Sequence, residues 1–203
     1  MCLALVLLTL IAIDIGRGSS LAAASEIPSF DRVRVLDAPR SFSDVELVDQ
    51  NGESALLTDL HGRVAFVFFG FTNCPDVCPL AMVRFRQLYS SGLVDTDKVA
   101  FVMISVDGQR DTPQALKSFL AEYSSDFIGL TGDPAAVRPI AKQFSAYFFK
   151  GNESDGNYTV SHSPQAFVVD PSGRVRAELY SASTEAMAGV ANALLVEHAT
   201  ASN

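Results

Sequence analysis

Apolar residues dominate two runs in the middle of the chain, at Val64–Phe69 and Val99–Val106. Runs of this kind are typical of strands that are covered on both faces of a sheet. Between the two runs, Met82, Phe85 and Leu88 recur at the spacing of one helix face. We therefore expect a strand, a helix and a second strand in succession, which is the repeating unit of a parallel sheet.

The alternation of strands and helices continues toward the C-terminus. Asp111-Thr112-Pro113 and Asp133-Pro134 each place a capping residue before a proline, which is the pattern of a helix start. The remaining predicted elements are strands at Phe127–Leu130, Ala166–Val169 and Arg174–Leu179, a polar loop at Lys150–Tyr158 and a last helix from about Thr184 to His198.

A β-hairpin is predicted in front of the first buried strand. The pair Asn51-Gly52 lies between the short apolar runs Val45–Val48 and Ala55–Leu57, which is a strong hairpin signal. A strand–helix series that closes with two strands and a helix is the thioredoxin pattern. We therefore expect one α/β domain of thioredoxin-like fold at residues 41–200, with an N-terminal β-hairpin extension.

The N-terminal 24 residues resemble a targeting segment. Their apolar core spans 11 residues, 3–13, whereas a membrane span needs roughly 20. Small residues at Ala22–Ala24 are typical of a cleavage site, so we predict a secretory signal, with an uncleaved membrane anchor as the alternative. Residues 25–40 carry Pro28 and Pro39 and are interpreted as a linker. Either alternative predicts an extracytoplasmic (periplasmic) domain, secreted or tethered to the membrane.

Charge and cysteine usage narrow the class of protein. The formal net charge of −8 argues against a nucleic-acid-binding protein, which needs a basic face. Cysteine occurs three times, and Cys2 lies in the targeting segment, so Cys74 and Cys78 remain for the domain. A single local pair indicates redox or metal chemistry, because a disulfide-stapled scaffold would need more cysteines.

The cysteine pair occupies a position suited to chemistry. It lies in the run Gly70–Pro79, after a buried strand and before a helix, where ligands gather in open α/β sheets. A helical spacing of four places Cys74 and Cys78 on one face, and the helix N-terminus is expected to lower a thiol pKa. Two neighbouring thiolates can chelate Cu(I) or oxidise to a disulfide.

Other interpretations of the pair are a structural disulfide, two buried thiols or a structural zinc site. Structural zinc takes four ligands, and the chain has no second cysteine pair. His162 is the expected third ligand, because it ends a polar loop directly before a strand. His61 and His198 are the alternatives.

Three further residues, Met82, Asp107 and Asp111, could have either a structural or a functional role. Met82 lies on the helical stripe of the cysteines and its thioether could bind Cu(I), but we expect it to pack in the core. Asp107 and Asp111 follow the second buried strand. We expect Asp111 to cap the next helix, with Thr112 as the alternative cap, and Asp107 to be a solvated loop residue.

Three blocks of the sequence, taken in order, resemble the Sco/SenC family. Gly70–Pro79 resembles the Cys-Pro-x-x-Cys-Pro signature of that family, Ser105–Pro113 its second block, and Val160–Gly173 its third. The resemblance covers about residues 45–198. It implies a thioredoxin-like fold and a copper ion, Cu(I) with Cu(II) as an alternative state, held by Cys74, Cys78 and His162.

The resemblance also implies a function. The family is associated with assembly of the binuclear copper site of cytochrome c oxidase, so the expected partners are subunit II of that oxidase, a copper donor and a thiol reductant. A thiol-disulfide oxidoreductase that uses the same cysteines is the alternative. Thioredoxin-type catalysts carry two residues between their cysteines, and this chain carries three, which favours copper. A peroxiredoxin would need a threonine three residues before its cysteine, whereas Thr72 lies two before Cys74.

The chain departs from the family pattern at four positions. Asn73 stands where the family often has histidine, and Ser161 where it often has aspartate. Gly108 and Gln109 stand where proline and glutamate are common. None of these changes removes a ligand. Ser161, however, cannot offer a carboxylate that orients the neighbouring His162.

Overall fold

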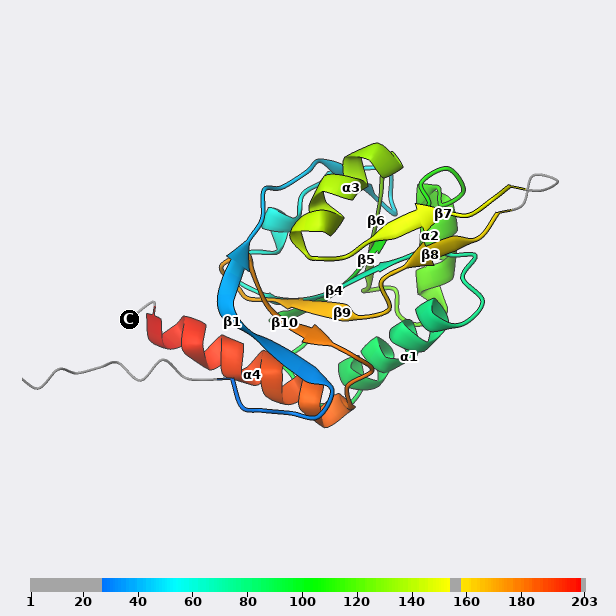
Figure 1. Cartoon of the computed structure of the whole chain (residues 1–203). Coiled ribbons are helices and arrows are strands. Elements are labelled where there is room, and N and C mark those ends of the chain that lie inside the picture. The colour runs from blue at the N-terminus through cyan, green and yellow to red at the C-terminus, as the bar shows by residue number, and fades with distance from the viewer. Residues whose placement is uncertain (1–26, 154–157, 202–203) are drawn as a thin grey trace, which may run out of the picture.

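A mixed eight-stranded sheet forms the centre of the structure, a computed structural model that describes residues 27–153 and 158–201 (Figure 1). The strand order is β1-β10-β9-β4-β5-β6-β2-β3, and a separate two-stranded sheet joins β7 and β8. The elements in chain order are β1 (Val33–Ser41), β2 (Leu47–Asp49), β3 (Ser54–Ala55), a 3-10 helix (Leu57–Leu60), β4 (Val64–Gly70), α1 (Val77–Tyr89), β5 (Val99–Ser105), α2 (Pro113–Ala121), β6 (Ile128–Thr131), α3 (Pro134–Gln143), β7 (Phe148–Lys150), β8 (Val160–His162), β9 (Ala166–Val169), β10 (Arg174–Leu179) and α4 (Thr184–Ala201).

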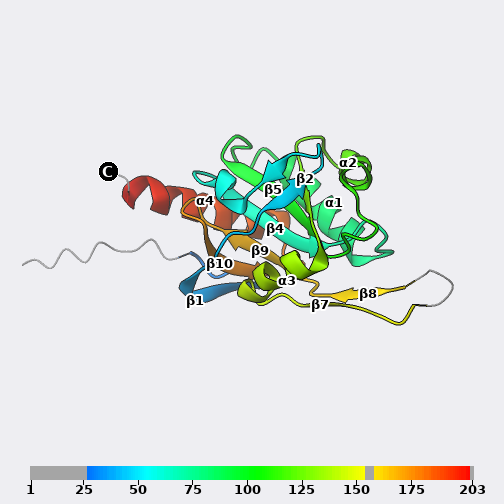
Figure 2. The same cartoon turned by 90° about the horizontal axis from the view of Figure 1, so that it is seen from above.

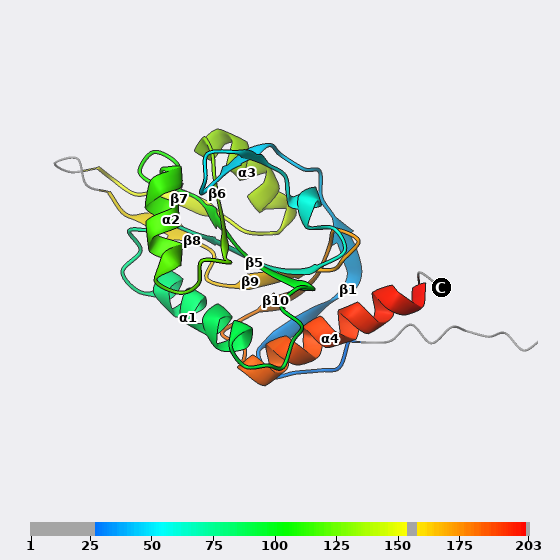
Figure 3. The same cartoon turned by 180° about the vertical axis from the view of Figure 1, so that it is seen from behind.

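The helices cover both faces of the sheet. Helices α1, α2 and α4 lie on one face, whereas α3 and the β7–β8 hairpin lie on the other (Figures 2 and 3). The order β4-α1-β5, followed later by β9-β10-α4, is the arrangement expected for a thioredoxin-like fold. The predicted fold class is confirmed.

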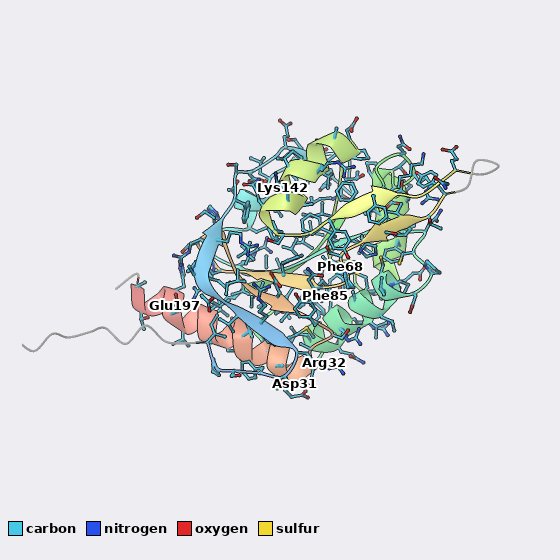
Figure 4. All side chains as sticks on the ribbon, in the orientation of Figure 1. Asp31, Arg32, Phe68, Phe85, Lys142 and Glu197 are labelled. Atoms are coloured by element: carbon cyan, nitrogen blue, oxygen red, sulfur yellow. The ribbon has the colours of Figure 1, made fainter. Side chains whose placement is uncertain are left out.

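The two apolar runs form the central strands, as predicted. Every residue of β4 and β5 is buried, and the two strands pair in parallel. Helix α1 packs its apolar stripe against them, with Met82 and Phe85 among its buried residues. Phe68 of β4 and Phe85, both buried, are labelled near the middle of the molecule in Figure 4. The predicted hairpin also forms, because β2 pairs with β3, and β2 extends the sheet beyond β6.

Strand β1 lies where a linker was expected. It pairs antiparallel with β10 at the edge of the sheet, so residues 33–40 of the predicted linker form a strand instead. The pairing shifts register between Val35 and Arg40, around Pro39, which has no N–H to donate to a ladder. Because of this irregularity and the half-exposed edge position, the sequence of β1 does not show the alternation of apolar and polar residues that predicts a strand. The predicted targeting segment, residues 1–24, lies outside the described residues. Among the helices of the described part, none is long and apolar enough to cross a membrane.

Strands β7 and β8 flank the predicted polar loop at Lys150–Tyr158, and His162, expected in the loop before a strand, is instead the last residue of β8. Phe148 pairs with His162 and Lys150 with Val160, so the chain forms a hairpin that projects beside the sheet (Figure 2). Each strand has only three residues, too few for an alternation to be recognised in the sequence.

Candidate metal centre

The cysteine loop connects the end of β4 to the start of α1. Cys78 lies in the first turn of α1 and is fully buried, whereas Cys74 lies in the loop before the helix and is 8% exposed. The spacing of four suggested that the two cysteines share a helix face. They do not, because Cys74 lies outside the helix. At Gly70, an added Cβ would lie 2.7 Å from the Phe68 ring and 3.0 Å from the Cys78 sulfur. The missing side chain gives the thiol its space.

His162 approaches both thiols from the β7–β8 hairpin. Its Nε2 atom lies 3.5 Å from the Cys78 sulfur and 4.0 Å from the Cys74 sulfur. The three potential ligand atoms lie within 4.8 Å of one another. Two aromatic rings, Phe68 and Phe71, meet the imidazole edge-on at centroid distances of 5.7 and 5.6 Å. The structure thus brings the three predicted ligands into one shielded cluster.

A backbone carbonyl sets the orientation of the imidazole. Nδ1 of His162 lies 2.9 Å from the carbonyl oxygen of Ser163, which can only accept a hydrogen bond. Nδ1 therefore carries the proton, and the lone pair of Nε2 faces the thiols. The neighbouring Ser161 is exposed, and the Ser163 carbonyl supplies the acceptor that a carboxylate at position 161 would otherwise offer. Ser163 itself is buried, and its hydroxyl accepts from the Tyr147 N–H at 2.9 Å.

The electrostatics of the cluster differ from the expected lowering of a thiol pKa. Burial raises the pKa of Cys78 strongly, and the hydrogen bond to Cys74 and the charge of Asp111 raise it further. The helix N-terminus does not compensate for this desolvation, so the expectation was wrong for Cys78. Burial also lowers the pKa of His162, which keeps the imidazole neutral at pH 7. Without a metal, the site holds a Cys78 thiol and a neutral histidine.

Comparison with known proteins agrees with this geometry. The SCO1/SenC sequence model matches residues 36–195. The chain belongs to the SCO1/SenC family. A protein of Stutzerimonas stutzeri is 37% identical over 170 residues, which cover 78% of this chain and 83% of the relative.

Solved structures of the family share the fold. Bradyrhizobium japonicum ScoI with copper bound has a TM-score of 0.67 and 32% identity, over 75% of this chain and 97% of ScoI. Yeast Sco1 with copper bound has a TM-score of 0.67 and 27% identity, over 80% of this chain and 90% of Sco1.

Asp111 holds the cysteine loop of this SCO1/SenC domain. Its carboxylate is fully buried and accepts hydrogen bonds from the Thr72 N–H at 3.0 Å, the Thr72 hydroxyl at 2.6 Å and the Ser105 hydroxyl at 2.7 Å. The helix cap is instead Thr112, whose hydroxyl accepts from the Ala115 N–H at 3.2 Å. The favoured assignment of Asp111 as the cap was therefore wrong. Its carboxylate instead fastens the loop that carries Cys74 to strand β5.

Asp107 is buried rather than solvated, which corrects the second expectation for this segment. It is 3% exposed and accepts from Arg110 Nε at 2.5 Å and from the Tyr158 hydroxyl at 2.5 Å. The role of Tyr158 carries no signal in the sequence, because its contact joins a strand-end loop to a residue 51 positions later.

Gly108, one of the four positions that depart from the family pattern, fits the close packing of this loop. A Cβ at Gly108 would lie 1.9 Å from the carbonyl oxygen of Gly132. The loop after β5 therefore approaches the chain after β6 more closely than any side chain would allow. The proline that is common in the family at this position would require the two segments to separate.

The other candidate ligands lie outside the cluster. His61 is exposed beside Gly173, and His198 lies in α4. Met82 is buried in the core, as expected. Within residues 27–153 and 158–201, Cys74, Cys78 and His162 are the group of His, Cys, Asp or Glu side chains placed to hold a metal ion. Both cysteines are free thiols. This three-ligand set lacks the fourth protein ligand of a structural zinc site.

Proposed function

We propose that this chain is a copper chaperone that holds one Cu(I) ion through Cys74, Cys78 and His162. The observation that carries the proposal is the convergence of two buried free thiols and the lone pair of one half-buried imidazole. Sulfur ligands with an imidazole suit a soft, monovalent ion, and three ligands are too few for a closed zinc site. The copper-bound relatives ScoI and Sco1 support the choice of metal.

The recipient and the compartment belong to the same proposal. By family membership, the copper would pass to the binuclear site of cytochrome c oxidase, in subunit II, outside the cytoplasm. A donor would supply Cu(I), and a thiol reductant would keep Cys74 and Cys78 open, because a disulfide offers no thiolate. Thiol-disulfide exchange needs no third ligand, so the placement of His162 beside both thiols favours metal transfer over an oxidoreductase activity.

X-ray absorption of the reduced, copper-loaded protein tests the ligand set. We expect one Cu(I) per chain, with two sulfur neighbours and one nitrogen neighbour. The His162→Ala variant serves as the control and should lose the nitrogen contribution while it keeps both sulfurs. Four sulfur neighbours, or only oxygen and nitrogen neighbours, would refute the proposal.

Copper binding is expected to strengthen as the pH rises. The pKa of the Cys78 thiol is raised in the metal-free protein, so Cu(I) must displace its proton. Each proton displaced changes the apparent affinity about tenfold per pH unit. His162 adds no competition near pH 7, because its pKa is lowered and it is already neutral. Competition titrations at pH 6, 7 and 8 measure the slope, and an affinity that is independent of pH would contradict the prediction.

A further inference from the structure

His162 lies on β8, which forms no strand pairing with the main sheet. Among the described strands, β7 and β8 pair only with each other. The cysteines, in contrast, are held by β4 and α1, in the core of the domain. The chain joins β9 of the main sheet four residues after His162, and the side chains that fasten the hairpin to the body set how the rest of β8 lies beside the thiols.

The base of the hairpin is fastened from α3. Arg138 Nη1 donates to the carbonyl oxygen of Phe148 at 3.0 Å, and its guanidinium lies 4.6 Å from the centre of the Phe148 ring. Two bonds between Tyr147 and Ser163, each 2.9 Å, close the hairpin at the same end. These contacts hold the end of β8 at His162. The start of β8, at Val160, is held by a second set of contacts.

The second fastening is Tyr158. Its hydroxyl donates to the buried carboxylate of Asp107 at 2.5 Å, and its carbonyl oxygen accepts from Arg110 Nη1 at 3.1 Å. The Arg110 guanidinium lies 3.8 Å from the centre of the Tyr158 ring, and Lys150 Nζ lies 3.8 Å from the same centre. Burial and the bond to Asp107 raise the pKa of Tyr158 to about 12, so the phenol remains a donor at physiological pH.

Tyr158 meets a loop that also positions the thiols. Asp107 and Arg110 precede Asp111, which fixes Thr72 in the cysteine loop. Arg110 lies 6.0 Å from the centre of the Phe71 ring, and Phe71 meets the His162 ring edge-on. One segment of five residues, 107–111, thus holds both halves of the metal centre in register.

We propose that Tyr158 is the positioning residue for His162: its bond to Asp107 and its stacking with Arg110 fasten the hairpin so that Nε2 stays beside both thiols. This inference rests on the proposed copper function. Without the fastening, the imidazole spends less time at the metal, and Cu(I) is held by the two thiolates alone for part of the time. The phenol hydroxyl then controls copper affinity without touching the metal.

The test is the Tyr158→Phe variant, which removes the hydroxyl and keeps the ring beside Arg110. We expect its Cu(I) affinity to fall about tenfold, the lower end of what loss of a ligand's supporting contact costs. Tyr180→Phe is the matched control. The Tyr180 hydroxyl donates to the buried Glu178 at 2.6 Å, and Arg34 pairs with that carboxylate at 3.0 Å, at the β1–β10 edge. This control should bind Cu(I) as the wild type does.

A double-mutant cycle separates positioning from a general effect on the fold. In a His162→Ala background, Tyr158→Phe should cause no further loss of Cu(I) affinity, because there is no imidazole left to position. Arg110→Met, which loses the bond to the Tyr158 carbonyl and the ion pair with Asp107, should show the same dependence on His162. The reduction potential of Cys74 and Cys78 should remain that of the wild type in both variants.

Two outcomes overturn the inference and leave the copper function intact. In the first, Tyr158→Phe binds Cu(I) as tightly as the wild type, with an unchanged nitrogen contribution in X-ray absorption. In the second, it weakens binding equally with and without His162. Failure of the proposed function looks different, because the wild-type protein itself would then lack the nitrogen neighbour of Cu(I), and the inference would fall with it.

Discussion

Replacement of His162 by alanine is expected to weaken Cu(I) binding by at least about 100-fold and to leave the domain folded. The imidazole is one of the three proposed ligands, so its loss should exceed the cost of losing a supporting contact. It stands at the end of a short hairpin outside the main sheet, and its aromatic contacts are with Phe68 and Phe71. The core that β4, β5 and α1 form does not depend on it.

The same variant separates copper transfer from thiol-disulfide exchange. Both functions need Cys74 and Cys78, but exchange needs no third ligand. We expect His162→Ala to keep the thiol-disulfide couple and its exchange with a client peptide, and to fail to support oxidase assembly in cells at low copper. His61→Ala is the matched control, because His61 is exposed and lies outside the cluster.

Oxidase activity in cells that carry His162→Ala at low copper would favour the reductase function over the chaperone. Circular dichroism and thermal unfolding of the variant accompany the assay. They establish that any loss of activity comes from the missing ligand and not from a loss of structure.

The centre of the fold was predictable because its signals are local. β4 and β5 are continuous apolar runs, and α1 repeats its apolar residues at helical spacing. The elements that were missed lack such signals. β1 is an irregular edge strand that carries Pro39, and β7 and β8 have three residues each, so their pairing is set by tertiary contacts.

The candidate ligands could be named from the sequence, but their surroundings could not. The cysteine pair and His162 were found from residue type, their place at strand ends and the family resemblance. The raised pKa of Cys78 follows from complete burial, which no spacing reveals. Likewise, Asp111 precedes Thr112-Pro113 in the sequence, where a helix cap is expected. Only the folded chain brings its carboxylate to Thr72, 39 residues away.

The buried carboxylate of Asp111 gives the second large effect. Asp111→Ala is expected to lower the free energy of unfolding by about 3 kcal/mol, because the Thr72 N–H and the Ser105 hydroxyl both lose their acceptor. The loop that carries Cys74 should loosen as well, so Cu(I) binding should weaken. Urea denaturation of the metal-free, reduced protein measures the first effect, and Cu(I) competition measures the second.

Asp111→Asn is the matched variant and should lie within about 1 kcal/mol of the wild type at neutral pH. The amide oxygen can accept from the Thr72 N–H and the Ser105 hydroxyl, which in the wild type donate to the same carboxylate oxygen. The amide nitrogen can donate to the Thr72 hydroxyl.

The pH dependence of stability gives a further check on Asp111. Burial raises the pKa of Asp111 in the folded state, so the native protein binds this proton more tightly than the unfolded chain does. The stability that the group contributes is therefore greatest at low pH and falls as the pH rises from about 4 through the raised pKa. Asp111→Asn should gain stability relative to the wild type over that interval, whereas equal destabilisation by alanine and asparagine would show that the hydrogen bonds do not hold the loop.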